Sequence, residues 1–309
     1  MPLQPTNVRG RVRGGGGHGI EESMRTLGVI GGSGLYAMEG LEDVEEHLLE
    51  TSFGPPSDAI VSGRLGETRL LFLPRHGRGH RVAPHEINYR ANVLALKQLG
   101  AEQLVSFSAV GSMKDSVHPS DVVVVDQFID RTRSRPSTFF EGVGLVAHVS
   151  MADPVDAALS SALWRAAVDS GARAHRGGTY VCIEGPQFST RAESNLYRSW
   201  GVDVIGMTNL PEARLAREAE LPYATVALVT DYDCWHQAEE DVSVAAVLAV
   251  LHRNVETAQQ ILRKVLGALP DPAESPASRA LDHALITAPD RISAEAKQKL
   301  APLIARRMA

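Results

Sequence analysis

The sequence is poor in cysteine and in long apolar runs, and each shortage excludes a class of protein. Only two cysteines, Cys182 and Cys234, occur in 309 residues. They are too far apart for a Cys-x-x-Cys pair, so we expect neither a zinc site nor a disulfide framework. No stretch approaches the ~18 consecutive apolar residues of a membrane-spanning helix. A reducing, cytoplasmic location therefore fits the composition best.

The chain also lacks an excess of basic residues. Lys and Arg number 31 against 37 Asp and Glu, which gives a formal net charge of -6. Binding to a nucleic-acid backbone depends on a basic excess, so we expect neither nucleic acid nor a membrane among the partners. Any phosphate group bound by this chain must be held by a few local residues.

Three segments differ in composition. Residues 1–26 are rich in Gly and Arg and show no periodicity, which predicts a flexible leader. Residues 27–268 alternate β-branched runs with helical patterns and show no break, which predicts a single domain. Residues 269–309 open with the linker-like DPAESPAS and end in a Lys- and Arg-rich helix. We expect this extension to cover the core or to pack against a partner.

The pattern of residues 27–268 is typical of an α/β protein with helices on both faces of a sheet. One helix is predicted to start at Asp153, with Pro154 in the first helical position, and another at the capping box Thr190-x-x-Glu193. A long helix is predicted over 242–269. The segments predicted as strands are 27–31, 68–74, 102–110, 121–128, 179–185, 202–207 and 223–230.

A glycine-rich turn, GGSGLYA at 31–37, follows the first predicted strand. It fits the G-x-G-x-x-G/A fingerprint of dinucleotide-binding proteins, but Gly40 and the prolines at 55–56 interrupt the helix and second strand that such a unit needs. Leu35 stands where a G-x-S-x-G nucleophile elbow needs glycine. The turn is therefore either structural or a place where backbone N–H groups and the Ser33 hydroxyl converge on an anion.

Three further strand ends carry groups suited to an anion. Open α/β sheets bind ligands at the carboxyl ends of their strands, and helix N-termini favour negative charge. The sequence therefore predicts a phosphate-sized site. The groups are Arg75 and His76 after one strand, Ser108 and Ala109 at the end of the next, and Thr208 before a helix with Asn209-x-x-Glu212 as its cap pattern.

Two other clusters allow more than one interpretation. His76, His80 and His85 suggest a metal site, but His-x-x-x-His binds zinc from one helical face, and the glycines between these histidines disfavour a helix. We therefore expect no metal. Asp231 and Asp233 follow a buried strand, and they either end it as solvated carboxylates or take part in chemistry.

A series of blocks in one order resembles the 5′-methylthioadenosine phosphorylase branch of the trimeric purine nucleoside phosphorylases. The blocks are GVIGGSGLY, FGPPSDAI, PRHGRGH, NYRAN, DQFIDRT, IEGPQFSTRAES, MTNLPEA and TDYDCW, and the resemblance as a whole runs from about Gly28 to about Leu248. The resemblance implies a mixed central β-sheet flanked by helices. It also implies phosphorolysis of 5′-deoxy-5′-(methylthio)adenosine, with inorganic phosphate as co-substrate and no cofactor, in methionine and purine salvage.

The resemblance further implies a role for individual residues. Asp231 and Asp233 would face the purine, and His148 would reach across a subunit boundary in a homotrimer. The implied phosphate contacts are Ser33, Arg75, His76, Ser108, Ala109 through its N–H, and Thr208. The implied nucleoside contacts are Phe188, Ser189, Met207, His80, His148, Val244, Val247 and Leu248. The apolar members of the second set would otherwise be ordinary core residues.

The implied chemistry makes demands on Asp231. To donate a proton to purine N7 it must stay protonated near neutral pH, so we expect its pKa to be raised by burial and by Asp233. An aspartate suits a 6-amino purine. Gly206 and Val110 stand where relatives carry other residues, which leaves adenosine or halogenated 5′-deoxyadenosines as alternative substrates. A 6-oxopurine phosphorylase, a hydrolytic nucleosidase and a non-catalytic nucleoside-binding protein are the rival functions.

Overall fold

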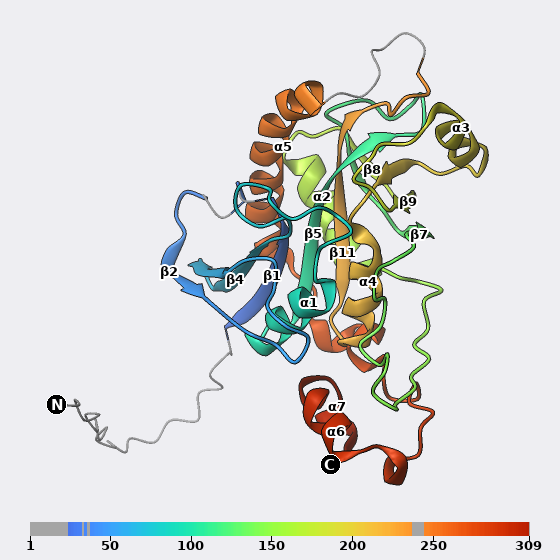
Figure 1. Cartoon of the computed structure of the whole chain (residues 1–309). Helices are drawn as coiled ribbons and strands as arrows, with labels where there is room; N and C mark the ends of the chain where they lie inside the picture. Colours follow the sequence, from blue (N-terminus) through green and yellow to red (C-terminus); the bar gives the residue numbers. More distant parts are fainter. Residues whose placement is uncertain (1–23, 33, 36–37, 237–243, 309) are drawn as a thin grey trace, which may run out of the picture.

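The computed structural model describes residues 24–32, 34–35, 38–236 and 244–308. Figure 1 shows a twisted central sheet with helices packed against it and a short helical tail at one end of the molecule. In these ranges, 11 strands join one sheet that contains both parallel and antiparallel pairs. The prediction of a mixed α/β fold is confirmed. Within the described ranges, no helix combines the length and the apolar character that crossing a membrane requires.

The sheet is organised around β5. Its path runs β2-β3-β4-β1-β5-β10-β9-β7, while β11 pairs with both β5 and β6, and β6 pairs with β8. The strands are β1 (Arg25–Gly31), β2 (Glu42–His47), β3 (Ile60–Leu65), β4 (Thr68–Pro74), β5 (Gln103–Ser112), β6 (Val122–Val124), β7 (Gln127–Arg131), β8 (Ala174–Arg176), β9 (Thr179–Ile183), β10 (Val204–Gly206) and β11 (Tyr223–Asp231).

The sequence predicted most of the buried strands and missed β2, β3 and β8, of which β3 is largely buried. The strand β2 is solvent-exposed along nearly its whole length, so it lacks the apolar alternation by which strands are recognised. The predicted strand 121–128 is wrong as a single element. The chain pairs with β11 and β8 up to Val124 and with β9 from Gln127 onward. Between them the Asp126 carboxylate accepts the Gly178 N–H at 3.0 Å.

The helices lie on both faces of the sheet, as Figure 1 shows for α5 and α4. They are α1 (Tyr89–Gln98), α2 (Ala157–Asp169), α3 (Arg191–Ser199), α4 (Asn209–Glu218), α5 (Val244–Val265), α6 (Ala294–Lys299) and α7 (Ala301–Met308). Short 3-10 turns at 266–268, 272–274, 276–279 and 289–291 complete the carboxyl-terminal part.

The two predicted helix starts have different outcomes. The capping box of Thr190 and Glu193 is present, so the predicted start of α3 is confirmed. The predicted start at Asp153 is wrong. Asp156 is the N-cap of α2, and its carboxylate accepts the Leu159 N–H at 2.7 Å. Asp156 has the extended backbone that an N-cap requires, whereas the Asp-Pro pattern at 153–154 lies ahead of the helix.

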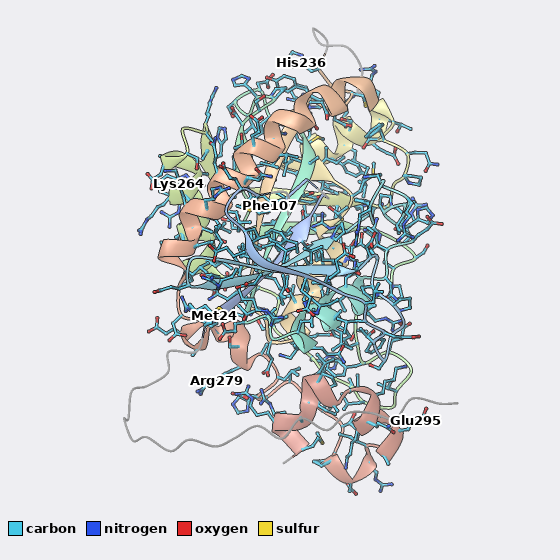
Figure 2. The ribbon with its side chains drawn as sticks, turned by 90° about the vertical axis from the view of Figure 1, so that its left-hand side faces the viewer. Met24, Phe107, His236, Lys264, Arg279 and Glu295 are labelled. Atoms are coloured by element: carbon cyan, nitrogen blue, oxygen red, sulfur yellow. The ribbon has the colours of Figure 1, made fainter. Side chains whose placement is uncertain are left out.

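The tail joins the larger hydrophobic core. Leu281, Leu300 and Leu303 are almost fully buried and belong to the same cluster as α1 and α4 residues. Arg307 at the end of the tail pairs with Glu220, which follows α4. Figure 2 shows His236, which follows Asp231 along the chain, at the end of the molecule opposite Glu295 of the tail. The tail therefore packs against the end of the domain that lies far from His236. The boundaries 1–26, 27–268 and 269–309 remain a prediction.

Candidate active site

Within the described part of the chain, one edge of β5 is unpaired over a short stretch, where the neighbouring strand changes from β1 to β10. The strand β1 pairs with β5 as far as Ser106, and β10 joins the same side only at Gly111. Among the described residues, no strand pairs with this edge between those two positions. Phe107 turns its carbonyl to this edge, where it accepts Arg75 Nη1 at 3.1 Å. Because peptide groups alternate along a strand, Ala109 directs its N–H to the same opening, and Ala109 itself is exposed.

Three side chains meet beside this opening. The Ser108 hydroxyl lies 3.1 Å from the Thr208 hydroxyl and 3.3 Å from the Tyr180 hydroxyl. The Thr208 N–H donates to the Tyr180 oxygen at 3.4 Å. Burial raises the pKa of Tyr180 to about 12, so the phenol keeps its proton and can donate it to Ser108. Ser108 and Thr208, predicted from separate strand ends, thus share one hydrogen-bonded cluster.

Thr208 stands at the start of α4, but the predicted cap pattern is wrong. The described contacts of the Thr208 side chain include no cap hydrogen bond, and Leu210 departs from helical geometry with φ -120 and ψ 136. Asn209 instead points inward, and its amide donates to Ser106, Tyr223 and Thr225 at 2.7–3.0 Å. The first turn of α4 is therefore held by a buried polar network behind the opening.

Arg75 is fixed by Glu212 in that network. Their side chains are 3% and 2% exposed, and the guanidinium donates to both carboxylate oxygens, at 2.8 and 3.1 Å. Its Nη2 also donates to Ser106 Oγ at 2.6 Å. Burial opposes the charge on Arg75, but Glu212 outweighs it and raises the arginine pKa. Four of the five guanidinium N–H groups are thus committed within the protein, and the positive charge is largely matched.

His76 lies in a turn whose backbone is not helical. Gly77, Gly79 and His80 all have positive φ, which confirms that these histidines do not share a helix face. The His76 Nδ1 lies 2.8 Å from the Val82 carbonyl, and its ring stacks on His80 with centroids 4.2 Å apart. Burial lowers the pKa of His76 to about 4. At neutral pH the neutral ring donates from Nδ1 to Val82 and leaves Nε2 as an acceptor.

Asp231 ends β11 on the other side of β5. Burial raises the pKa of Asp231, although hydrogen bonds from the Thr230 hydroxyl at 2.6 Å and the Asp233 N–H at 2.8 Å lower it. The expectation that Asp233 would raise this pKa is wrong, because Asp233 acts on it through a stabilising backbone N–H. A Cβ at Gly111 of β5 would lie 2.9 Å from the Asp231 carboxylate, so that glycine leaves room for it.

Two loops meet next to these strand ends. The Met207 thioether packs on Gly185, where a Cβ would come within 2.5 Å of the sulfur. The Cys234 thiol lies 3.4 Å from the Ser189 carbonyl, which ties the segment after Asp233 to the segment after β9. Ser189 Oγ is buried without a hydrogen-bond partner among the described residues. Phe188 is 45% exposed, so it is not an ordinary core residue.

Five predicted contacts are not placed at these strand ends. Ser33 lies outside the described residues. The backbone of Val244, Val247 and Leu248 belongs to α5, but their side chains lie outside the described part of the structure. His148 is exposed, and its N–H donates to the Ala284 carbonyl of the tail at 2.8 Å.

The sequence did not single out Tyr180 or the role of Glu212. Tyr180 reads as one more buried strand residue, and its hydroxyl becomes important only because Gly206 leaves space for it. A Cβ at Gly206 would lie 2.0 Å from that hydroxyl. The sequence pattern assigns Glu212 to a helix cap. An arginine such as Arg75 after an apolar strand indicates that an anionic partner is needed, but the sequence does not show which residue is that partner.

Comparisons with known proteins identify the family of this chain. Residues 26–267 match the family model described as the phosphorylase superfamily. A protein of Geobacter sulfurreducens named S-methyl-5′-thioadenosine phosphorylase is 55% identical over 276 residues, which are 89% of this chain and 96% of that protein. One of the same name from Thermosynechococcus vestitus is 55% identical over 284 residues, 91% of this chain and 98% of that protein.

This chain belongs to the S-methyl-5′-thioadenosine phosphorylase family, within the phosphorylase superfamily.

Solved structures of this family have the same fold. A methylthioadenosine phosphorylase from an antarctic soil metagenomic library gives a TM-score of 0.85 at 49% identity, covering 90% of this chain and 98% of that one. The methylthioadenosine phosphorylase of Schistosoma mansoni in complex with adenine gives 0.76 at 34% identity, covering 91% and 98%. The family resemblance and the fold class read from the sequence are thus confirmed.

Proposed function

We propose that this enzyme catalyses the phosphorolysis of 5′-deoxy-5′-(methylthio)adenosine. A phosphate oxygen forms a bond to C1′, the C1′–N9 bond breaks, and adenine and 5-methylthioribose 1-phosphate are released. The observation that carries the proposal is the opening along β5. There Ser108, Ala109 and Thr208 present donors, and β11, paired with the same strand, ends at Asp231.

The phosphate side of the proposed site works through oriented hydrogen-bond donors. The Ala109 N–H and the hydroxyls of Ser108 and Thr208 would bind phosphate oxygens beneath C1′, with Ser33 completing the set from the glycine turn. Arg75 would offer its remaining N–H, and the neutral His76 ring would accept a hydrogen bond from a phosphate hydroxyl. Holding the dianion in place stabilises the cationic sugar and replaces a bimolecular encounter.

The base side of the proposed site works through Asp231. Its raised pKa favours the protonated carboxyl, which would give its proton to N7 as the C1′–N9 bond breaks. Asp233, Phe188, Ser189, Met207 and His80 would complete the nucleoside pocket. Because a carboxyl oxygen can accept from an exocyclic amine, the enzyme would prefer a 6-amino purine.

The proposal extends to assembly and surroundings. We propose a cytoplasmic homotrimer acting in methionine and purine salvage, with phosphate as co-substrate and no further cofactor. His148 of one chain would line the 5′ pocket of the next, alongside Val244, Val247 and Leu248. The exposed His148 side chain, on a segment held against the tail, suits such a contact.

A substrate panel run with and without phosphate tests the function. We expect phosphate-dependent release of adenine from methylthioadenosine, with inosine and guanosine turned over poorly, measured by chromatography of the bases. Adenosine and 5′-chloro-5′-deoxyadenosine in the same panel decide the alternative 5′ groups. An undiminished rate without phosphate would identify water as the nucleophile, and faster cleavage of inosine would identify a 6-oxopurine phosphorylase.

A further inference from the structure

We infer that Arg135 is a positioning residue that fixes, relative to each other, the two backbone segments bearing the proposed nucleoside and phosphate contacts. The inference rests on the proposed function. Arg135 lies between β7 and α2 in a stretch without regular secondary structure, and its side chain is only 1% exposed. It is too deeply buried for a surface role, and its contacts show what it does instead.

The first segment held by Arg135 surrounds Thr208. Its Nη1 donates to the carbonyls of Met207 at 2.6 Å and Leu210 at 2.8 Å, one on each side of Thr208 and Asn209. Leu210 has extended dihedral angles inside α4, so its carbonyl is not directed along the helix. A buried carbonyl needs a donor, and Arg135 supplies it. The guanidinium therefore stabilises the irregular start of α4 that places Thr208 beside Ser108.

The second segment held by Arg135 is the end of β9. Its Nη2 donates to the carbonyls of Glu184 at 2.6 Å and Ile183 at 3.3 Å, and its Nε lies 3.5 Å from the Glu184 carboxylate. The chain continues from Glu184 into the loop with Phe188 and Ser189. A third contact, from Nη1 to the Tyr89 hydroxyl at 2.9 Å, anchors the guanidinium to the start of α1.

Only a guanidinium can make these contacts together. It presents five donors in one rigid plane, so a single side chain satisfies carbonyls from both segments. Lysine offers one point charge and cannot span them. Without the guanidinium, carbonyls on both segments lose their charged donor, with only the Cys182 thiol left 3.6 Å from the Leu210 carbonyl, and each segment is free to shift. A displacement of about 1 Å at a reacting centre costs about 100-fold in rate.

A purely structural role makes a different prediction. If Arg135 only stabilised the loop that carries it, its loss would lower the amount of folded enzyme and leave the activity of each folded molecule unchanged. If it positions the two segments, folded variants would turn over slowly. A guanidinium ion supplied from solution would then restore part of the lost rate.

The experiment compares Arg135→Ala, Arg135→Lys and the control Arg25→Ala with the wild type. Arg25 likewise donates to two carbonyls, of Leu269 and Pro270 at 2.7 and 2.8 Å, but it joins β1 to the tail. Methylthioadenosine and phosphate are varied separately, with and without guanidinium at tens of millimolar, far below unfolding concentrations. The folded fraction is measured by circular dichroism and size exclusion.

We expect kcat/KM of folded Arg135→Ala for the nucleoside to fall about 100-fold, with at least about tenfold recovery in guanidinium. Arg135→Lys would stay well below the wild type, and Arg25→Ala would keep wild-type kcat/KM and be unaffected by guanidinium. If Arg135→Ala does not fold, the lysine variant decides by the same criterion.

The inference is overturned if either folded Arg135 variant keeps kcat/KM within about threefold of the wild type. It is also overturned if guanidinium fails to rescue folded Arg135→Ala. These outcomes are distinct from failure of the proposed function, in which the wild type itself would show no phosphate-dependent cleavage in the same assay.

Discussion

At the scale of single residues, the site combines neutral donors with a carboxyl whose ionisation is disfavoured. Arg75 is matched by Glu212, burial lowers the pKa of His76, and burial raises the pKa of Asp231. A buried group that keeps its neutral form avoids the desolvation of a charge. The same property suits Asp231 to its proposed role as proton donor, and it lowers stability once the carboxyl is ionised.

Replacement of Asp231 by asparagine should therefore lower activity and also remove a pH dependence of stability. We expect turnover of methylthioadenosine to fall by orders of magnitude, because asparagine has no proton to give to N7. A group with a raised folded-state pKa contributes stability that is lost as pH rises through that pKa. Urea denaturation of the wild type should show this loss, and the variant should lack it.

Two results would contradict this role of Asp231. One is a near-wild-type rate of phosphorolysis by the asparagine variant. The other is an identical dependence of unfolding free energy on pH for both proteins, which would mean that the folded environment leaves the carboxyl unperturbed.

Substitution of Gly206 is predicted to displace Tyr180. A Cβ at Gly206 would lie 2.0 Å from the tyrosine hydroxyl and 2.6 Å from its Cζ, and Tyr180 is fully buried. We expect Gly206→Ala to lower the free energy of unfolding by about 1–3 kcal/mol through overpacking. It should also raise KM for phosphate, because Tyr180 contacts Ser108 and Thr208.

Gly267→Ala is the matched control for that substitution, since a Cβ there meets no atom within 4 Å. Equal unfolding free energies for the two alanine variants, measured by denaturant titration, would show that Tyr180 moves aside without cost.

At the scale of elements, burial alone did not decide what the sequence could predict, because β3 and α1 are largely buried and neither was recognised. The strand β4 was placed without error because Leu70–Pro74 form a buried apolar run, and α3 was placed by a cap that its own residues complete. The strand β2 and the break between β6 and β7 are determined by pairing with neighbouring strands, which the local sequence does not show. Thr208 was selected correctly as the start of α4, but the cap assigned to Asn209 and Glu212 was not, because both side chains bind partners distant in sequence.

The start of α2 provides a test at this scale. Asp156 caps the helix and also accepts the Ser275 hydroxyl at 2.6 Å. We expect Asp156→Ala to lower the unfolding free energy by about 1–2 kcal/mol, within the range measured for N-cap residues. Asp153→Ala, which removes the carboxylate that the sequence pattern favoured, should change it by less than about 0.5 kcal/mol. Chemical denaturation that ranks the two variants the other way would contradict this assignment.

At the scale of the whole molecule, the tail and the sheet domain share one hydrophobic core. Leu300 of the tail is fully buried in the cluster that also contains α1 and α4 residues. Composition predicted a linker followed by a helix and left open what that helix would contact. The tail contacts the sheet domain through ion pairs with Glu220 and through a shared apolar surface. Neither contact is local in sequence.

Leu300→Ala should therefore destabilise the tail and the sheet domain together. We expect a loss of about 2–5 kcal/mol, as for other buried leucines, in a single cooperative transition. Leu196→Ala, at a position 50% exposed on α3, is the control and should cost little. A biphasic thermal transition, or equal stability of the two variants, would mean that the tail is an independent attachment.

The pairing of Arg75 with Glu212 also bears on selectivity among the ions of a cell. Because Glu212 already neutralises the charge of Arg75, the site does not attract anions through a net positive charge. The opening would instead recognise the number and direction of oxygen lone pairs, which chloride cannot imitate and tetrahedral oxyanions can. Inhibition by ordinary monovalent salt should then be slight, whereas arsenate, with the shape of the proposed co-substrate, should be able to replace it.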